Sequence, residues 1–386
     1  MQTMQSICAV EGVKAAGIKE GKYGLALIEA EGTAAAVFTM NKACAAPIIL
    51  MRERIRNGYL TATITNSGCA NALTGKQGIS DAMEMAAIAG ECLGVEPDTI
   101  GVASTGVIGR YLNLPLIRDQ CARIAPTLQT SPNAEIAAAR AIMTTDLVEK
   151  HALVRSDGFV IGGICKGSGM IAPNMGTMLG YLYTDAAVDH VFLQDALRSA
   201  VRRSFNRVVV DGDTSTNDVV FCTATGTAGK VPNEEFSVAL EECCTLLAKQ
   251  IAQDGEGATK MIEVVVRNAR TEEDADLIAK TIVGSPLVKT AVYGEDPNWG
   301  RIIAAAGRAG ADIDPEIVSC WIENPTIRAE VCTHGRIAAD LTMAKTALAG
   351  NTVRIELDLG LGSETAVAWG CDLTEKYVEI NGKYTT

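Results

Sequence analysis

Two spacings of apolar residues alternate along the chain, one repeating every second position and the other every three or four. The first is typical of strands and the second of helices. In the first third, this pattern predicts helices at 79–93, with Ser80 as the N-cap, and at 114–128 and 134–143. It predicts strands at 23–29 and 33–38, joined as a hairpin around Glu31-Gly32, and at 46–51, 61–65 and 99–103.

The same alternation continues to the end of the chain. A hairpin is expected at 151–164, closed at Ser156-Asp-Gly158. Further helices are predicted at 189–205, 234–252, 272–282, 299–307 and 338–348. Further strands are predicted at 178–183, 208–210, 219–225, 261–266, 317–322 and 327–332, then a hairpin of 352–358 with 365–371, and a last strand at 377–380. Hairpins mixed with alternating strands and helices predict an α+β or layered α/β fold, with mixed β-sheets and flanking helices.

Composition narrows the class of protein. The 386 residues are 48% apolar, enough for a large core, and their net charge is −12 without any basic block. Nucleic-acid binding needs a cationic surface, so we do not expect it. The twelve cysteines form no Cys-x-x-Cys pair and no zinc-type cluster with histidine, which favours thiols buried in the core. We expect a cytoplasmic protein without a signal peptide or membrane span.

Two polar loops resemble ligand-binding motifs only weakly. Residues 211–218 have the acidic content of a calcium loop, but the glycine and the terminal glutamate are misplaced, so turns closed by Asn and Asp side chains are the expectation. Residues 254–260 lack the Gly-x-x-x-x-Gly-Lys spacing of a phosphate loop. We therefore expect no metal and no cofactor.

The segment 166–179 carries the strongest chemical signal. It joins a glycine-rich loop containing Pro173 to an apolar run, and Thr177 lies at the junction. A threonine hydroxyl is a weak nucleophile unless a base lies beside it, and a free α-amine on the same residue is such a base. Cleavage between Gly176 and Thr177 would create that amine. The alternative is a glycine-rich turn that enters a buried strand. The only histidines, His151, His190 and His334, stand apart from acids and nucleophiles, so a base from elsewhere is needed.

Several long segments together resemble the glutamate N-acetyltransferase family, also called ornithine acetyltransferases, of arginine biosynthesis. The similarity spans nearly the whole chain, and the segments that carry it are 38–47, 66–75, 103–109, 143–146, 166–179, 211–218, 254–260, 296–301, 368–373 and 377–386. The sequence departs from the family pattern at Gly176, where alanine is usual, and after Asp146.

The resemblance implies a role for each matching residue. Thr177 corresponds to a self-generated N-terminal nucleophile, so that residues 1–176 and 177–386 become two intertwined chains. Thr105 and Gly106 correspond to the donors of the oxyanion hole. The substrate-binding positions are Thr144, Lys166, Thr177, Glu256, Asn381 and Thr386. Two copies of each chain are expected to form a heterotetramer.

The implied reaction moves the acetyl group of N-acetylornithine to glutamate through an acetyl-Thr177 ester, without metal or nucleotide. The sequence leaves open whether acetyl-CoA is a second donor. A competing hypothesis is an N-terminal-nucleophile amidohydrolase or aminopeptidase, in which water resolves the ester. A small-molecule-binding protein without catalysis would keep its chain intact.

Overall fold

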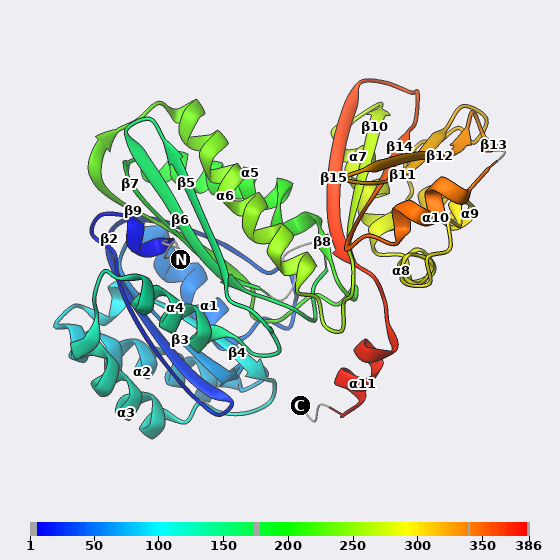
Figure 1. The fold of residues 1–386 in the computed structure, drawn as a ribbon. Helices are drawn as coiled ribbons and strands as arrows, with labels where there is room; N and C mark the ends of the chain where they lie inside the picture. Colours follow the sequence, from blue (N-terminus) through cyan, green and yellow to red (C-terminus); the bar gives the residue numbers. More distant parts are fainter. Residues whose placement is uncertain (1–5, 173–177, 339, 384–386) are drawn as a thin grey trace.

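The computed structural model describes residues 6–172, 178–338 and 340–383, which form two lobes, each built on one β-sheet (Figure 1). The sheet of the first lobe has eight strands in the described residues, in the order β4-β3-β2-β9-β7-β6-β5, with β1 paired to β2. Its strands are β1 (Lys14–Glu20), β2 (Tyr23–Phe38), β3 (Tyr59–Cys69), β4 (Ile100–Val107), β5 (Lys150–Ser156), β6 (Phe159–Lys166), β7 (Leu179–Ala187) and β9 (Val219–Lys230).

Helices cover both faces of this sheet. The helices on one face are α1 (Ala46–Arg54), α2 (Gly75–Leu93), α3 (Leu114–Ile124) and α4 (Pro132–Ile142), and those on the other are α5 (His190–Arg203) and α6 (Asn233–Gln253). Strand β7 contributes to both cores because successive side chains point to opposite faces. Tyr181 and Tyr183 lie in the first core, where their hydroxyls meet Thr65 and Thr63, and Leu182 lies in the second.

The order of strands places two late strands in the middle of the sheet. Strand β9 pairs antiparallel with β2 on one side and parallel with β7 on the other, and β7 pairs antiparallel with β6. Strands β7 and β9 come after Thr177 in the chain, whereas β2 and β6 precede Gly176. The parts of the chain on the two sides of the expected cleavage point therefore share one sheet.

The second lobe has a seven-stranded sheet in the order β13-β12-β11-β14-β10-β15-β8. Its strands are β8 (Val208–Val209), β10 (Met261–Ala269), β11 (Ser319–Asn324), β12 (Ile327–Thr333), β13 (Arg336–Ile337), β14 (Thr352–Asp358) and β15 (Glu364–Cys371). A third core forms against α7 (Glu272–Val283), α8 (Pro286–Tyr293), α9 (Trp299–Gly307) and α10 (Thr342–Leu348). Short 3₁₀ turns occur at Ile7–Ala9, Ile55–Asn57, Pro97–Thr99, Ala125–Thr127 and Phe205–Arg207.

The predicted mixed sheets with flanking helices are confirmed, as is the hairpin of β5 and β6. Three local predictions in the first lobe are wrong. The expected hairpin around Glu31-Gly32 is the single strand β2, in which an irregularity between Glu29 and Gly32 takes up the turn-like residues. The apolar run 46–51 is helix α1, since Pro47 lies in its first turn, where proline favours a helix. Helix α2 begins at Gly75 after Thr74, not at Ser80.

Two predictions near the C-terminus are also wrong. Strands β14 and β15 form no hairpin, because β10 lies between them, parallel to β14 and antiparallel to β15. Residues 377–380 belong to helix α11 (Glu375–Lys383), not to a strand. The Thr374 hydroxyl accepts the backbone N–H of Lys376, and Glu379 pairs with Lys376 and Lys383 at helical spacing.

None of the described helices has the length and apolar content that crossing a bilayer requires.

The shared sheet predicts how two separate halves of the chain behave. We expect the two halves, residues 1–176 and 177–386, to co-purify as a folded pair when they are co-expressed as two polypeptides with a tag on one. The reason is that β7 and β9 of the second half fill the position between β2 and β6 of the first. Each half expressed alone should aggregate through its unpaired strand edges. Affinity capture followed by gel filtration measures both outcomes. The prediction would be contradicted if one half, expressed alone, were a monomer that unfolds cooperatively and does not bind the other half.

Candidate functional site

A cavity of about 120 Å³ lies where β4 and β6 end, next to the loop before β9. Its lining contains six of the residues expected at the site: Thr105, Gly106, Thr144, Lys166, Glu256 and Asn381. The remaining lining residues are Ala70, Ile108, Thr145, Gly169, Met170, Ser215, Thr216 and Asn217. Gly176, Thr177 and Thr386 lie outside the described residues. Positions far apart in the sequence thus meet in one place.

The end of β4 is fixed by close packing against β3. Gly106 has a φ of 128°, and a Cβ there would overlap the carbonyl carbon of Gly68, so only glycine fits. The side-chain amide of Asn217 donates to the carbonyl oxygen of Ser104 at 2.9 Å, which joins β4 to the loop before β9. The two residues expected to form the oxyanion hole therefore stand on a rigid support.

Lys166, the last residue of β6, carries the cation of the cavity wall. Its side chain is only 2% exposed, and its ammonium donates to the hydroxyl of Thr105 at 3.4 Å. Burial lowers the pKa of Lys166, while the carboxylate of Asp146 opposes this shift. Because the Thr105 oxygen accepts from the ammonium, its own O–H remains available to donate toward the cavity.

Beneath the cavity, Lys150 forms a buried ionic cluster with two carboxylates. Its ammonium lies 2.8 Å from Asp146 Oδ1 and 2.6 Å from Asp254 Oδ2, and the Lys150 side chain is inaccessible to solvent. Burial raises the pKa of Asp146, but the ammonium groups of Lys166 and Lys150 outweigh it and bring that pKa down to about 2. Asp146 is therefore an anion at neutral pH, and it interacts with the ammonium groups of Lys150 and Lys166.

The ionic cluster holds the backbone of three cavity segments. Asp146 accepts the backbone N–H groups of Thr144 at 3.1 Å and Gly167 at 2.6 Å. The carbonyl oxygen of Asp254 accepts the hydroxyl of Ser168 at 2.6 Å, and the Ser168 carbonyl accepts the N–H of Glu256 at 3.0 Å. The substrate positions expected at residues 144, 166 and 256 are therefore set by one buried network.

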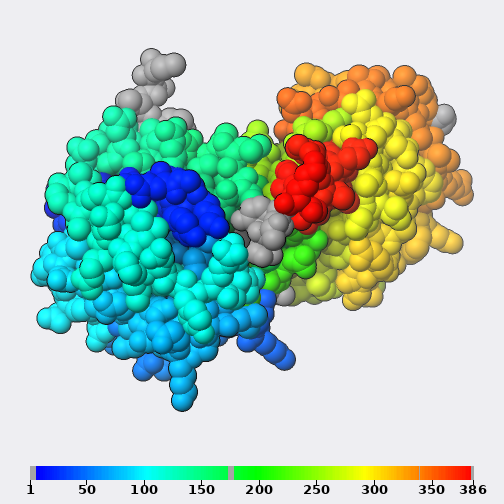
Figure 2. Space-filling view, turned by 90° about the horizontal axis from the view of Figure 1, so that it is seen from below, coloured from blue at the N-terminus to red at the C-terminus, as the bar shows by residue number. Residues whose placement is uncertain are grey.

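Helix α11 brings the chain terminus to the same cavity. Asn381 Nδ2 donates to Glu256 Oε2 at 2.7 Å, and the hydroxyl of Thr374 donates to the Gly257 carbonyl at 2.7 Å. A Cβ at Gly169 would overlap the Glu256 carboxylate, so this glycine makes room for it. In Figure 2 the red atoms of α11 lie on the surface beside the yellow and orange second lobe. The expected return of the tail to the cavity thus occurs through a helix.

The sequence pattern assigned no role to Lys150, Asp254 or Asp218. Lys150 and Asp254 are 104 residues apart, so no local motif joins them. Asp218 ends the loop 211–218, where the acidic residues resemble a calcium loop only weakly. That loop contains an expected turn closed by an aspartate, in which Asp211 Oδ1 accepts the N–H of Asp213, and a further turn in which Ser215 Oγ accepts the N–H of Asn217. Within the described ranges, no group of three metal-binding side chains occurs.

The histidines and cysteines lie apart from the cavity wall. His151 meets the Ser6 hydroxyl at 2.9 Å, and His190 Nδ1 lies 3.0 Å from the Ala34 carbonyl oxygen. All twelve cysteines are free, and burial raises the pKa of most of them, that of Cys222 to about 12. The ten buried cysteines serve as small apolar residues of the three cores, whereas Cys44 is half-buried and Cys92 is exposed.

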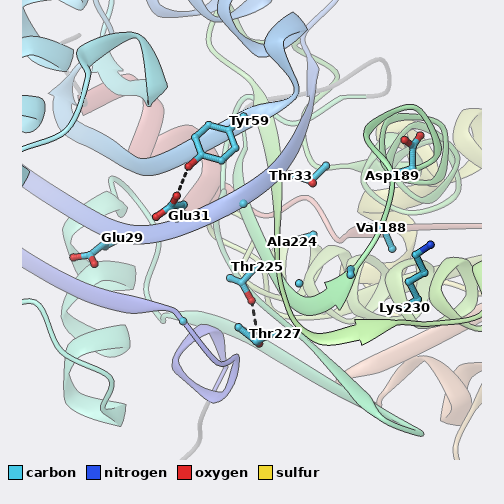
Figure 3. A pocket seen from close by; sticks show the side chains of 14 residues that line it. Glu29, Glu31, Thr33, Tyr59, Val188, Asp189, Ala224, Thr225, Thr227 and Lys230 are labelled. Atoms are coloured by element: carbon cyan, nitrogen blue, oxygen red, sulfur yellow. Dashed lines mark hydrogen bonds between the residues drawn. The ribbon is translucent and has the colours of Figure 1, made fainter.

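A larger and more open hollow of about 880 Å³ lies elsewhere on the first lobe (Figure 3). Its wall includes Glu29, Asp189 and Lys230, the hydrogen-bonded pair of Tyr59 with Glu31, and the hydroxyls of Thr225 and Thr227. None of the described residues expected at the site lines it. The small cavity, not this hollow, gathers the predicted chemistry.

The family model of the ArgJ family matches residues 10–386. The chain belongs to the ArgJ family. The glutamate N-acetyltransferase of Methanosarcina mazei is 52% identical over 388 residues, which cover 98% of each chain. The arginine biosynthesis bifunctional protein ArgJ of Archaeoglobus fulgidus is 46% identical, with 98% of this chain and 100% of the relative covered. Among solved structures, the ArgJ protein of Bacillus halodurans shares 44% identity and a TM-score of 0.49, covering 52% of this chain and 96% of that one.

The ArgJ match confirms the resemblance that the motifs indicated. It extends through both lobes and α11, so the six cavity residues that were expected at the site fall inside it. The roles of the individual residues stay predictions, because a family match does not test them.

The ionic cluster predicts a large effect of a single buried substitution. Lys150→Met leaves Asp146 and Asp254 side by side without their shared cation, so the free energy of unfolding should fall by about 3–5 kcal/mol. Denaturant titration at neutral pH measures this change. Lys76→Met, at an exposed lysine, is the matched control and should change stability by less than about 0.5 kcal/mol. Equal stability of the two variants would show that the cluster contributes nothing.

Proposed function

We propose that this ArgJ-family protein transfers the acetyl group of N-acetylornithine to glutamate, in arginine biosynthesis, through an acetyl ester on Thr177. The observation that carries the proposal is the convergence of six residues with predicted roles in one cavity. The second support is the M. mazei relative, a protein named glutamate N-acetyltransferase, which matches over nearly the full length of both chains.

The nucleophile requires a cut chain. In self-cleavage, Thr177 Oγ attacks the Gly176 carbonyl carbon, the peptide C–N bond breaks, and water hydrolyses the resulting ester. The new α-amine has an ordinary pKa of about 7.7, so at neutral pH a good part of it can accept the hydroxyl proton. The central position of β7 and β9 supports this step, because both products would remain in one sheet.

The acetyl transfer then runs as two half-reactions. Thr177 attacks the acetyl carbonyl, ornithine leaves, and the amine of glutamate takes the acetyl group from the ester. Negative charge develops on the carbonyl oxygen in both steps. The Thr105 hydroxyl and the Gly106 N–H are the proposed donors, and the ammonium beside Thr105 strengthens that hydroxyl as a donor.

Charge suggests how the amino-acid substrates are held. Glu256 has one carboxylate oxygen bonded to Asn381, which leaves the other for an ammonium group. Lys166 supplies positive charge for a carboxylate or for the developing oxyanion. These pairings would recognise a substrate carboxylate and the side-chain ammonium of N-acetylornithine, whose α-nitrogen is an amide, with Thr144 and Thr386 completing the site.

An N-terminal-nucleophile amidohydrolase is the competing function. It would use the same nucleophile and oxyanion hole but release acetate to water. The curated relatives at 44–52% identity are named glutamate N-acetyltransferase or ArgJ, which favours the transferase. The expected heterotetramer and the cytoplasmic location are proposed from the sequence, and light scattering and cell fractionation check them.

The oxyanion assignment predicts a loss of turnover without a loss of affinity. Removing one oxyanion donor costs about 3 kcal/mol in the transition state, so Thr105→Ala should lower kcat about 100-fold and leave KM nearly unchanged. Steady-state kinetics with N-acetylornithine and glutamate measure both constants. Thr145→Ala, at a neighbouring cavity threonine without an assigned role, is the matched control. A change confined to KM would remove Thr105 from the oxyanion hole.

The function itself is tested by mass and product analysis of the purified protein. Two polypeptides, 1–176 and 177–386, should appear. After N-acetylornithine and glutamate are added, the acetyl group should pass to glutamate without release of acetate. Thr177→Ala should abolish cleavage and transfer, whereas Thr177→Ser should retain part of both. An uncut chain with full activity would disprove the amine-as-base mechanism, and acetate release without glutamate would favour the hydrolase. The same assay with acetyl-CoA determines whether it is a second donor.

A further inference from the structure

Asp218 is a fully buried carboxyl beside the start of β7, and none of the proposed transfer steps uses it. It precedes β9, and its 0% exposure places it among the most enclosed polar residues of the first lobe. Its Oδ1 accepts the backbone N–H of Met178 at 3.0 Å, while its backbone carbonyl accepts the N–H of Thr39 at 3.0 Å. Both hydrogen bonds fix the carboxyl group at the beginning of the strand.

The second oxygen of this carboxyl has no hydrogen-bond partner among the described residues. Thr39 lies nearby, but its hydroxyl donates to the Ser215 carbonyl at 2.7 Å. Burial raises the pKa of Asp218 well above its ordinary value. This effect outweighs the Met178 N–H, the Lys166 ammonium and the nearby hydroxyls of Ser215 and Thr39, all of which lower the pKa. The raised pKa favours the protonated form of Asp218, and because Oδ1 already accepts from Met178, the O–H of that form would lie on the second oxygen.

The position of Met178 gives this acid its significance. The nitrogen that Asp218 contacts is covalently bonded to the carbonyl carbon of Thr177. Covalent geometry keeps the nitrogens of successive residues within about 4 Å of each other. The carboxyl thus contacts the peptide N–H that follows Thr177 in the chain, and it is the nitrogen of Thr177 that requires a proton in self-cleavage.

We propose that Asp218 is the proton-transfer group of self-cleavage, an inference that rests on the proposed function. As Thr177 Oγ bonds to the Gly176 carbonyl carbon, the C–N bond breaks and the carboxyl gives its proton to the departing nitrogen. The hydroxyl proton of Thr177 then passes to the carboxylate. The products are an ester, a neutral amine and the original acid, so the step needs no other reactant.

The other acids near the cavity are already engaged. Asp146 is ionised and paired with Lys150, and Glu256 bonds to Asn381. Asp211 accepts the N–H groups of Met170 and Ile171, at 2.6 and 2.9 Å, and so holds the loop that leads toward the junction. Asp218 alone among these described carboxyls combines full burial with a partnerless oxygen.

The test compares Asp218→Asn with Asp213→Asn, an exposed residue of the same loop. Asparagine keeps the shape of the side chain and can still accept the Met178 N–H, but it cannot exchange a proton. General acid–base groups contribute about 100-fold or more, so Asp218→Asn should cleave at least about 100-fold more slowly than the parent. Asp213→Asn should cleave at the parental rate. Freshly synthesised chains are followed by intact mass against time, and thermal unfolding verifies that each uncut variant is folded.

Hydroxylamine separates the acyl shift from ester hydrolysis, because it cuts esters but not peptide bonds. If Asp218 acts in the shift, hydroxylamine should not restore cleavage of Asp218→Asn. Restored cleavage, or cleavage at the parental rate without it, would overturn the inference. Should Asp218→Asn not fold, folded Asp218→Glu must still self-cleave, and its failure to do so would also overturn it. A parent chain that remains uncut would instead overturn the proposed function.

Discussion

Strands β7 and β9 lie between β2 and β6, and this insertion determines how the two parts of the chain on either side of position 176 are held together. The hydrogen bonds of β2 with β9 and of β6 with β7 join residues that precede position 176 to residues that come after it. A cut at the expected position would leave every one of these strand pairs intact. The sheet also delivers Lys166 and Met178 to one edge, where β6 ends and β7 begins. The proposed nucleophile is thus attached to a central strand, and rigid elements position such groups better than loops do.

The ionic cluster at Lys150 supports the same edge at an energetic cost. Taking three charges out of water is unfavourable, and attraction between them only partly repays it. Replacing such a cluster by apolar residues often stabilises a protein, so stability alone does not account for it. Its hydrogen bonds reach the backbone at Thr144 and Gly167, and through Ser168 they reach Glu256. We interpret the cluster as a device that fixes the cavity wall and keeps a cation beside Thr105.

Among the described residues that line the cavity, the second lobe contributes Asn381, from the helix that extends from its last strand. After β15, the chain turns at Thr374 and runs as α11 to Asn381, which bonds to Glu256. The helix buries no residue of its own, so its position depends on polar contacts. Besides those of Thr374 and Asn381, the Tyr377 hydroxyl donates to Asp211 at 3.3 Å and the Tyr293 hydroxyl donates to Glu375 at 2.7 Å. The part of the site that would face the amino-acid substrate is therefore less firmly packed than the part proposed to carry the chemistry.

The amino-acid pattern was enough to predict the type of most elements, the layered mixture of sheets and helices, and the family. It also singled out the residues that meet in the cavity, because long ordered motifs carry that information residue by residue. Predictions from the local pattern were wrong where pairing with a strand distant in the sequence determines the structure. The pattern of residues 352–371 predicts a hairpin, but β10 lies between the two strands. The pattern of residues 23–38 also predicts a hairpin, but pairing with β3 and β9 keeps these residues in one strand. Only the tertiary structure placed Lys150 against Asp254 and buried Asp218 beside Met178, because burial and charge pairing depend on contacts that sequence spacing does not encode.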